Sequence, residues 1–119
     1  MIVAGFGCRA DATEASFANA LAAARGDISV DAVATVQDKS PILADFAKMR
    51  DLPLIAVSQS DMEAQTTTTL SDTSLAAKNT GSVAEACALA AAGRNARLLA
   101  TRQVSQDRMV TCAIAQGDG

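Results

Sequence analysis

Basic, acidic and hydroxyl side chains follow two short apolar runs in the first third of the chain. Residues 5–9 have the sequence Gly-Phe-Gly-Cys-Arg and follow the first run, and a Thr, an Asp and a Lys follow the second. A glycine-rich turn that leads into a helix exposes backbone N–H groups, which could bind an anion together with a guanidinium. The candidate ligand contacts are therefore Gly5, Gly7, Cys8 and Arg9 in the first group, and Thr35, Asp38 and Lys39 in the second.

Each of these two groups has a purely structural alternative. Residues 5–9 could be an ordinary strand-to-helix turn, and Asp38 and Lys39 could be a solvated pair in a loop. If they are functional, Asp38 and Lys39 offer an acid/base pair, and Thr35 with Lys39 could hold a carboxylate-bearing substrate. Cys8 could be a nucleophile at a helix N-terminus, but the sequence places no general base beside it.

A third candidate group precedes the most apolar helical segment. Ser82 and Glu85 have the spacing of a capping box, in which each side chain bonds the other residue's backbone N–H. The same helix N-terminus, with Thr80 and Gly81, could face an acidic group of a ligand. Glu85 is therefore both a capping candidate and, with Asp38 and Lys39, a candidate catalytic residue.

The composition excludes several classes of site. Histidine is absent, which removes a Ser-His-Asp triad and any histidine-ligated metal, so we expect neither a metal nor a cofactor. The cysteines Cys8, Cys87 and Cys112 are odd in number and widely spaced, which indicates free thiols, with the last two buried in apolar patterns. A net charge of -3 with interleaved signs, and no Trp or Tyr, argues against nucleic-acid binding.

No apolar run approaches the ~18 residues of a membrane span. The opening run, residues 2–6, also lacks the basic flank of a signal peptide. We therefore expect a cytoplasmic protein without a membrane partner.

The strands that should position these side chains are short apolar or alternating runs. They are predicted at residues 2–6, Ala32–Val36, Leu54–Val57, 97–100 and 109–115. The last two flank a polar link and are expected to pair antiparallel. The continuous aliphatic run Leu54–Val57 predicts an interior strand that is buried on both faces.

Helices are predicted between the strands from capping signals. The first should start at an Asp11/Glu14 capping box and end at Gly26, the second at Ser40 with Pro41 in its first turn, and a brief third at Ser60/Glu63. Residues 66–79 show no period and predict an irregular surface segment. A last helix should run from Ser82 to Gly93. The side chains expected to face inward are Phe17, Ala20, Leu21 and Ala24 in the first helix, and Ile42, Leu43, Phe46 and Met49 in the second.

Strands that alternate with helices over 119 residues predict one α/β domain, residues 1–119. Its expected architecture is a three-layer sandwich with a mainly parallel sheet, helices on both faces and an antiparallel C-terminal strand pair. Ligands bind such sheets at the carboxyl ends of the strands, where residues 5–9, 35–39 and 58–63 should meet.

Four segments, taken in order, carry a resemblance to a known family. They are GFGCR at residues 5–9, ATVQDK at 34–39, GSVAEACAL at 81–89 and VTCAIA at 110–115. Their order and spacing resemble the CobE and CbiG C-terminal family, and the resemblance covers nearly the whole chain.

The resemblance implies a role in making the corrin ring of vitamin B12. The function it favours is an accessory or carrier protein that binds a corrin or precorrin intermediate. Two alternatives stay open. One is a hydrolase that opens a precorrin lactone as CbiG does, with Asp38 or Glu85 steering water and Lys39 stabilising the oxyanion. The other is a module that docks on another enzyme of the pathway.

Overall fold

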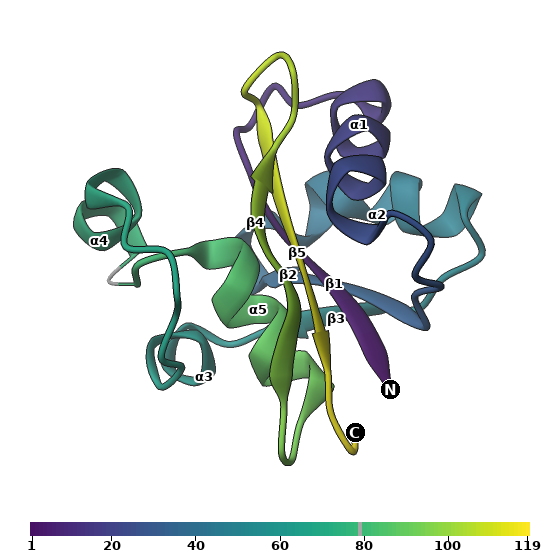
Figure 1. Cartoon of the computed structure of the whole chain (residues 1–119). Helices are drawn as coiled ribbons and strands as arrows, with labels where there is room; N and C mark the ends of the chain where they lie inside the picture. Colours follow the sequence, from purple (N-terminus) through teal and green to yellow (C-terminus); the bar gives the residue numbers. More distant parts are fainter. Residues whose placement is uncertain (79) are drawn as a thin grey trace.

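The computed structural model describes residues 1–78 and 80–119, and these form a five-stranded sheet in the order β3-β2-β1-β5-β4 (Figure 1). The strands are β1 (Ile2–Cys8), β2 (Ala32–Val36), β3 (Leu54–Val57), β4 (Arg97–Val104) and β5 (Val110–Gln116). The β1–β2 and β2–β3 pairs are parallel, whereas β5 is antiparallel to both β1 and β4. The five predicted strands and the antiparallel C-terminal pair are confirmed, but β1 continues to Cys8 and β4 to Val104, beyond their predicted ends at residues 6 and 100.

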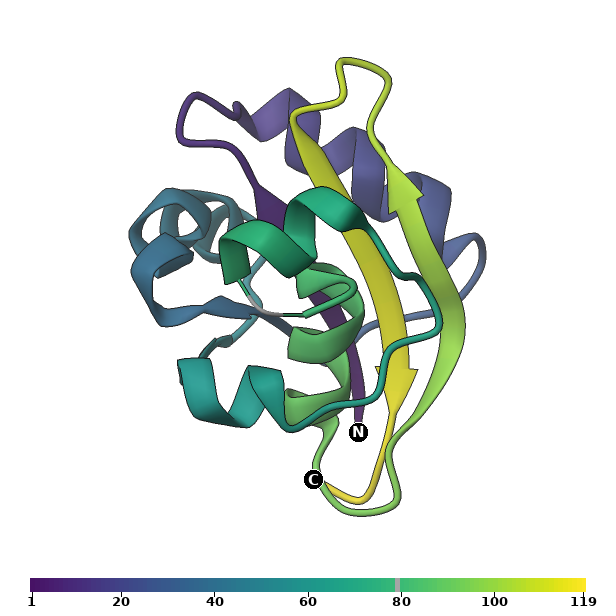
Figure 2. The same cartoon turned by 90° about the vertical axis from the view of Figure 1, so that its left-hand side faces the viewer.

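Helices cover both faces of the sheet, which confirms the three-layer α/β architecture (Figures 1 and 2). One face carries α1 (Glu14–Arg25) and α2 (Ser40–Met49), and the other carries α3 (Gln59–Glu63) and α5 (Val83–Ala92). A short 3-10 helix, η1 (Gln37–Lys39), joins β2 to α2. The remaining helix, α4 (Asp72–Lys78), lies outside α5 (Figure 1).

The three aromatic side chains of the protein form one cluster beneath α1 and α2. Phe6 meets Phe17 and Phe46 edge to face, with ring centroids 5.7 and 5.9 Å apart, and all three rings are buried. Such geometry adds to the stabilisation from apolar burial. The expected inward face of α1 (Phe17, Ala20, Leu21 and Ala24) is confirmed.

The opposite face of β1 is packed against a helix made largely of alanine. A Cβ atom added to Gly5 would lie 2.2 Å from the carbonyl oxygen of Ala84 and 2.4 Å from the backbone nitrogen of Ala88. The backbones of β1 and α5 therefore approach so closely that only glycine fits at position 5. Gly5 lies inside the strand and beneath α5, rather than in a turn after the strand as the sequence had suggested.

The prediction that Leu54–Val57 is an interior strand is wrong, because β3 is an edge of the sheet. Ala56 is exposed, and Leu54 and Ile55 are only partly buried. A continuous aliphatic run indicates that both faces of a strand are covered. It does not indicate whether another strand pairs with the free edge of that strand. In this sheet β5 and β4 are added beside β1, so β3 stays at the edge.

Two predicted helix starts are also wrong in their capping residue. The N-cap of α1 is Thr13, in a capping box with Ser16, and not Asp11 with Glu14. The N-cap of α3 is Ser58, two residues earlier than the predicted Ser60. The same three-residue spacing occurs more than once in such polar segments, so spacing alone does not select the start.

The second helix departs from prediction at both ends. Ser40 is the first residue of α2 and donates its hydroxyl to the Gln37 carbonyl instead of capping the helix. Leu43 and Phe46 are buried as predicted and Ile42 is partly buried, but Met49, which was expected to face inward, is 70% exposed in the last turn.

The segment expected to be irregular contains α4, and Asn79 at its end lies outside the described residues. Among the residues that the structure describes, no helix has both the length and the apolar character needed to cross a membrane.

A substitution of Gly5 by Ala should strongly destabilise the fold, because the new methyl group meets backbone atoms of α5 that cannot move independently. We expect the free energy of unfolding to fall by about 3 kcal/mol or more, the upper end of overpacking effects. Gly7→Ala is the matched control on the same strand. Its Cβ would lie 2.7 Å from the Thr111 hydroxyl, which belongs to a side chain that can shift, so the loss should be about 1 kcal/mol. Equal losses in chemical denaturation would contradict the close approach.

The three cysteines are free thiols and should differ in reactivity. Burial raises the pKa of the Cys87 thiol to about 12 and also raises the pKa values of Cys112 and of the half-buried Cys8. Because the thiolate is the reactive form, all three should react slowly at neutral pH and faster as the pH rises. Cys8 should be labelled first by a thiol reagent followed by mass spectrometry, and Cys8→Ser should remove that fast phase. Equal rates for all three would contradict this burial pattern.

Candidate functional site

A cleft of about 620 Å³ lies at the carboxyl ends of β1 and β2, beside the N-terminus of α5 and the hairpin between β4 and β5. We call it the cation-rimmed cleft. Its lining comprises Gly7, Cys8, Arg9, Ala10, Asp11, Val36, Lys39, Ser71, Lys78, Ser82, Val83, Arg102, Val104, Arg108, Met109, Val110 and Thr111. Its volume falls within the usual range of small-molecule sites.

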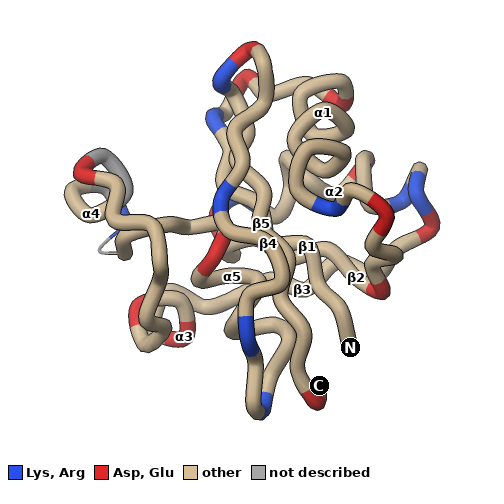
Figure 3. Tube along the Cα trace, in the orientation of Figure 1, with Lys and Arg blue, Asp and Glu red and all other residues tan. Residues whose placement is uncertain are grey.

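Cations dominate the charge of this cleft. The basic residues that line it are Arg9, Lys39, Lys78, Arg102 and Arg108, whereas among the described lining residues only Asp11 is acidic. Figure 3 shows basic positions both on β4 and on the hairpin that follows it. Residues from five separate parts of the chain therefore create a positive site on a protein whose net charge is -3. A low-dielectric cleft lined by one sign of charge concentrates ligands of the opposite sign.

The cleft also has an apolar surface. Val36 ends β2, Val83 begins α5, Val104 ends β4, and Met109 and Val110 lead into β5. A ligand that matches this cleft therefore combines an apolar body with negatively charged groups, because the cations line the same space.

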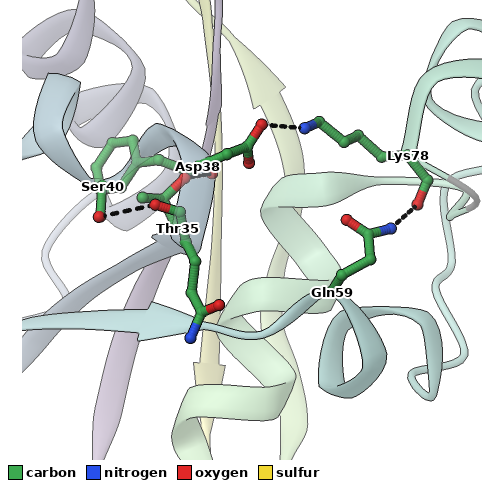
Figure 4. A network of polar contacts seen from close by, with 7 residues as sticks. Thr35, Asp38, Ser40, Gln59 and Lys78 are labelled. Carbon is green, nitrogen blue, oxygen red and sulfur yellow. Dashed lines mark hydrogen bonds and ion pairs between the residues drawn. The ribbon is translucent and has the colours of Figure 1, made fainter.

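One of the five cations is held by an ion pair. Lys78, at the end of α4, donates to the Asp38 carboxylate in η1, and Gln59 donates to the Lys78 carbonyl oxygen at 2.8 Å (Figure 4). The hydrogen bond from Lys78 holds the pKa of Asp38 below its ordinary value. Within residues 1–78 and 80–119, the other four cations of the cleft have no ion-pair partner. They are available to an anionic ligand.

The hairpin that carries Arg108 and Met109 is fixed to α1 by a carboxylate. Asp107 accepts hydrogen bonds from the Ser105 hydroxyl at 2.6 Å, from the Ser16 hydroxyl and from the Met109 N–H. The Ser105 bond, followed by the Ser16 bond, lowers the pKa of Asp107. These contacts determine where the hairpin lies relative to the cleft.

Glu85 is fully buried behind the cleft and does not line it. The Ser82 hydroxyl accepts from the Glu85 N–H as predicted for a capping box. The Glu85 carboxylate does not return the bond, because it accepts from the Thr68 N–H, from the Thr69 N–H and hydroxyl, and from the Arg102 N–H. Burial raises the pKa of Glu85, but these hydrogen bonds outweigh burial and hold it below its ordinary value.

Half of the ten ligand-contact candidates from the sequence line the cleft. They are Gly7, Cys8, Arg9, Lys39 and Ser82. The other five do not line it. Gly5 lies beneath α5, Thr35 is buried with its hydroxyl donating to the Phe6 carbonyl, and Asp38 is paired with Lys78. Thr80 is buried, and Gly81 lies against the loop before α4. Among the described residues, the buried Thr80 hydroxyl has no hydrogen-bond partner.

Sequence reasoning missed Lys78, Arg102 and Arg108. Lys78 lies in a segment that was expected to be irregular. The two arginines lie in the stretch that was predicted to be a polar link between the last strands, although Arg102 is in fact part of β4. A usable signal existed, because pairing the final strand antiparallel to the first would place that link at the carboxyl end of β1. No group of three or more His, Cys, Asp or Glu side chains suited to a metal ion occurs in the described part of the chain.

Comparison with protein families finds a match over residues 2–115 to the family described as the cobalamin synthesis G C-terminus. A comparison with curated proteins found no match.

Solved structures give the same relationship. A crystal structure of the cobalamin biosynthesis protein chiG from Agrobacterium tumefaciens str. C58 is 37% identical, with full coverage of both chains and a TM-score of 0.75. A crystal structure of CobE, a protein from the cobalamin (vitamin B12) biosynthetic pathway, is 26% identical, with a TM-score of 0.83 and coverage of 97% of this chain and 89% of that one.

A third structure, of a putative cobalamin biosynthesis protein G homolog from Sulfolobus solfataricus, shares the fold. It is 21% identical with a TM-score of 0.69, and the alignment covers 96% of this chain but 36% of that one. The family match covers nearly all of the sequence that forms the sheet, its helices and the cleft. The chain belongs to the cobalamin synthesis G C-terminal family, and its role is in cobalamin biosynthesis.

Proposed function

We propose that the cation-rimmed cleft binds a corrin or precorrin intermediate through its carboxylate arms, and that the chain acts as a binding or carrier protein in the pathway. The observation that carries this proposal is the set of five cations facing an apolar cleft with one lining carboxylate. A macrocycle with an apolar body and several anionic arms is complementary to both features.

The lining residues could share the work of holding such a ligand. Arg9 and Arg102 each carry a planar guanidinium, which suits bidentate contact with a carboxylate, whereas Lys39 acts as a point charge. Ser82 and Val83 place the N-terminus of α5 in the same cleft, where backbone N–H groups favour negative charge. Gly7 leaves the space beside β1 open, because a Cβ at this position would contact the side chains of Thr111 and Val83.

The geometry gives less support to a lactone-opening hydrolase. That reaction would need a carboxylate to steer water in the cleft, and the two candidates were Asp38 and Glu85. Asp38 is engaged by Lys78, and Glu85 is buried outside the lining with its carboxylate occupied by four donors. Neither predicted carboxylate is therefore free to steer water, and Asp11 is the only acidic residue among the described lining residues. The excess of cations in the lining favours binding over hydrolysis, and docking on another pathway enzyme is a further outcome that the experiments below distinguish.

Arg9→Ala and Lys39→Ala should each weaken binding of a corrin with free carboxylate arms. Each removes a charge-assisted contact worth about 1.5 to 3 kcal/mol, so the dissociation constant should rise roughly 10- to 150-fold. Titration of the corrin's visible absorbance measures this directly. The melting temperature should change little, because neither side chain is part of the core.

Lys48→Ala is the matched control, since Lys48 is an exposed lysine of α2 that does not line the cleft. It should bind as tightly as the unmodified protein. If Arg9→Ala and Lys39→Ala also bind normally, the cleft is not the binding site. If the corrin is recovered with an altered mass, a hydrolase is favoured, and if no corrin binds at all, a docking module is favoured.

Salt should weaken this binding in proportion to the number of charged contacts. An increase from about 0.1 M to about 1 M NaCl shortens the screening length from about 10 Å to about 3 Å. The affinity should therefore fall, and its dependence on salt should be smaller in Arg9→Ala, which has one contact fewer. A corrin whose arms are all amidated should bind weakly and show little salt dependence. Salt-independent binding of the carboxylate form would contradict recognition by the cations.

A further inference from the structure

Strand β4 contains an irregularity next to one of the cleft cations. Ala100 pairs with Ile114 and Gln103 pairs with Cys112, so β4 advances three residues (100 to 103) while β5 advances two (114 to 112). Between these two pairs one residue of β4 is extra, as in a β-bulge, and another shift of register lies between Leu98 and Ala100. Bulges leave a backbone group unpaired within the sheet and redirect side chains. Arg102 lies in this stretch and is one of the residues that line the cleft.

The buried carboxylate of Glu85 occupies the position opposite the bulge. Its Oε2 atom accepts the Arg102 N–H at 2.8 Å and the Thr69 hydroxyl at 2.6 Å, and its Oε1 atom accepts the N–H groups of Thr68 and Thr69 at 2.8 Å. Because Glu85 is in the first turn of α5, one side chain connects the helix, the bulge and the loop before α4.

The arrangement is specific for an ionised carboxylate. All four groups that face Glu85 are donors, so a neutral amide of the same shape would turn its NH2 group toward at least one donor. Burying a carboxylate costs free energy unless the carboxylate is fully hydrogen-bonded, and an apolar residue of similar volume would often be as stable. The gain from the carboxylate is therefore positional, because its four hydrogen bonds fix the segments that donate them.

Both segments held by Glu85 contribute to the cleft. β4 supplies Arg102 and Val104, and the loop of residues 66–71 leads to Ser71 and to the helix that ends at Lys78. Glu85 itself does not line the cleft, so its effect on a ligand would have to act through these neighbours.

We propose that Glu85 is a positioning residue that sets the place of the Arg102 guanidinium in the cleft by accepting the N–H of the β4 bulge, so that ligand affinity depends on its charge. The ligand of this inference is the one given by the proposed function. Whether or not a ligand is bound, the Glu85 carboxylate protects the Arg102 amide hydrogen from exchange.

Glu85→Gln, which keeps the shape and removes the charge, is the test. In the free protein, hydrogen exchange followed by NMR should show loss of protection at the amides of Arg102 and Thr69, with the β1–β5 amides unchanged. Binding of a corrin with free carboxylate arms should weaken by roughly tenfold, the scale of one charge-assisted hydrogen bond. Unchanged protection at Arg102 would overturn the proposal.

A double-mutant cycle separates positioning from a general loss of stability. Combined with Arg102→Ala, Glu85→Gln should add little further loss of affinity, because the group that it positions is already gone. Combined with Arg9→Ala, which Glu85 does not contact, the two losses should add. Additive losses in both cycles would overturn the proposal. Thr69→Val is a milder variant that removes one donor to the same carboxylate oxygen and should weaken affinity in the same direction if Glu85→Gln fails to fold.

The outcomes also separate this inference from the proposed function. If Arg9→Ala and Lys39→Ala weaken binding but Arg102→Ala and Glu85→Gln do not, the cleft binds the corrin and Glu85 has no positioning role. If the Arg102 amide loses protection in Glu85→Gln while no corrin binds the unmodified protein, the hydrogen-bond network stands and the proposed ligand is wrong.

Discussion

The antiparallel pairing of β5 with β1 is the constraint on which the site depends. It runs over the full length of both strands, from Ile2 opposite Gln116 to Cys8 opposite Val110. Because β5 enters at the end where β1 leaves the sheet, the hairpin before β5 lies beside the turn after β1. The Arg9 N–H bonds the Met109 carbonyl at this junction at 2.9 Å. Chain segments about a hundred residues apart in sequence thus form one wall of the cleft.

The second wall depends on the small side chains of α5. Gly5 and the alanines of the helix let the two backbones approach closely. The helix N-terminus at Ser82 and Val83 therefore lines the cleft at the carboxyl ends of β1 and β2. Larger residues at these positions would move the helix outward and open the cleft. The alanine-rich composition of the chain therefore shapes the cleft, because close packing places the N-terminus of α5 beside the cations.

A positively charged cleft occurs on an acidic protein because the fold gathers basic residues from distant parts of the chain at one place. The chain has ten basic and thirteen acidic residues in an interleaved order, and half of the basic ones line the cleft. Asp11 is the one acidic residue among the described lining residues, and three further carboxylates lie around the cleft with partners of their own. Asp38 pairs with Lys78, Asp107 accepts hydrogen bonds within the hairpin, and Glu85 accepts the Arg102 N–H of β4. Each of these three holds a cation of the cleft or the segment that carries one.

The sequence by itself determined the elements and the layers, because hydrophobic periodicity indicates which face of an element is buried and glycines indicate where helices end. It placed the five strands, the inward-facing Phe17 and Phe46, and the candidates Arg9, Lys39 and Ser82 that line the cleft. It could not place β3 at an edge, choose Thr13 over Asp11 as a cap, or bring Lys78, Arg102 and Arg108 to the site. Strand order, register and the bulge in β4 arise from contacts between residues far apart in the chain, and such contacts leave no periodic signal in the residues that make them.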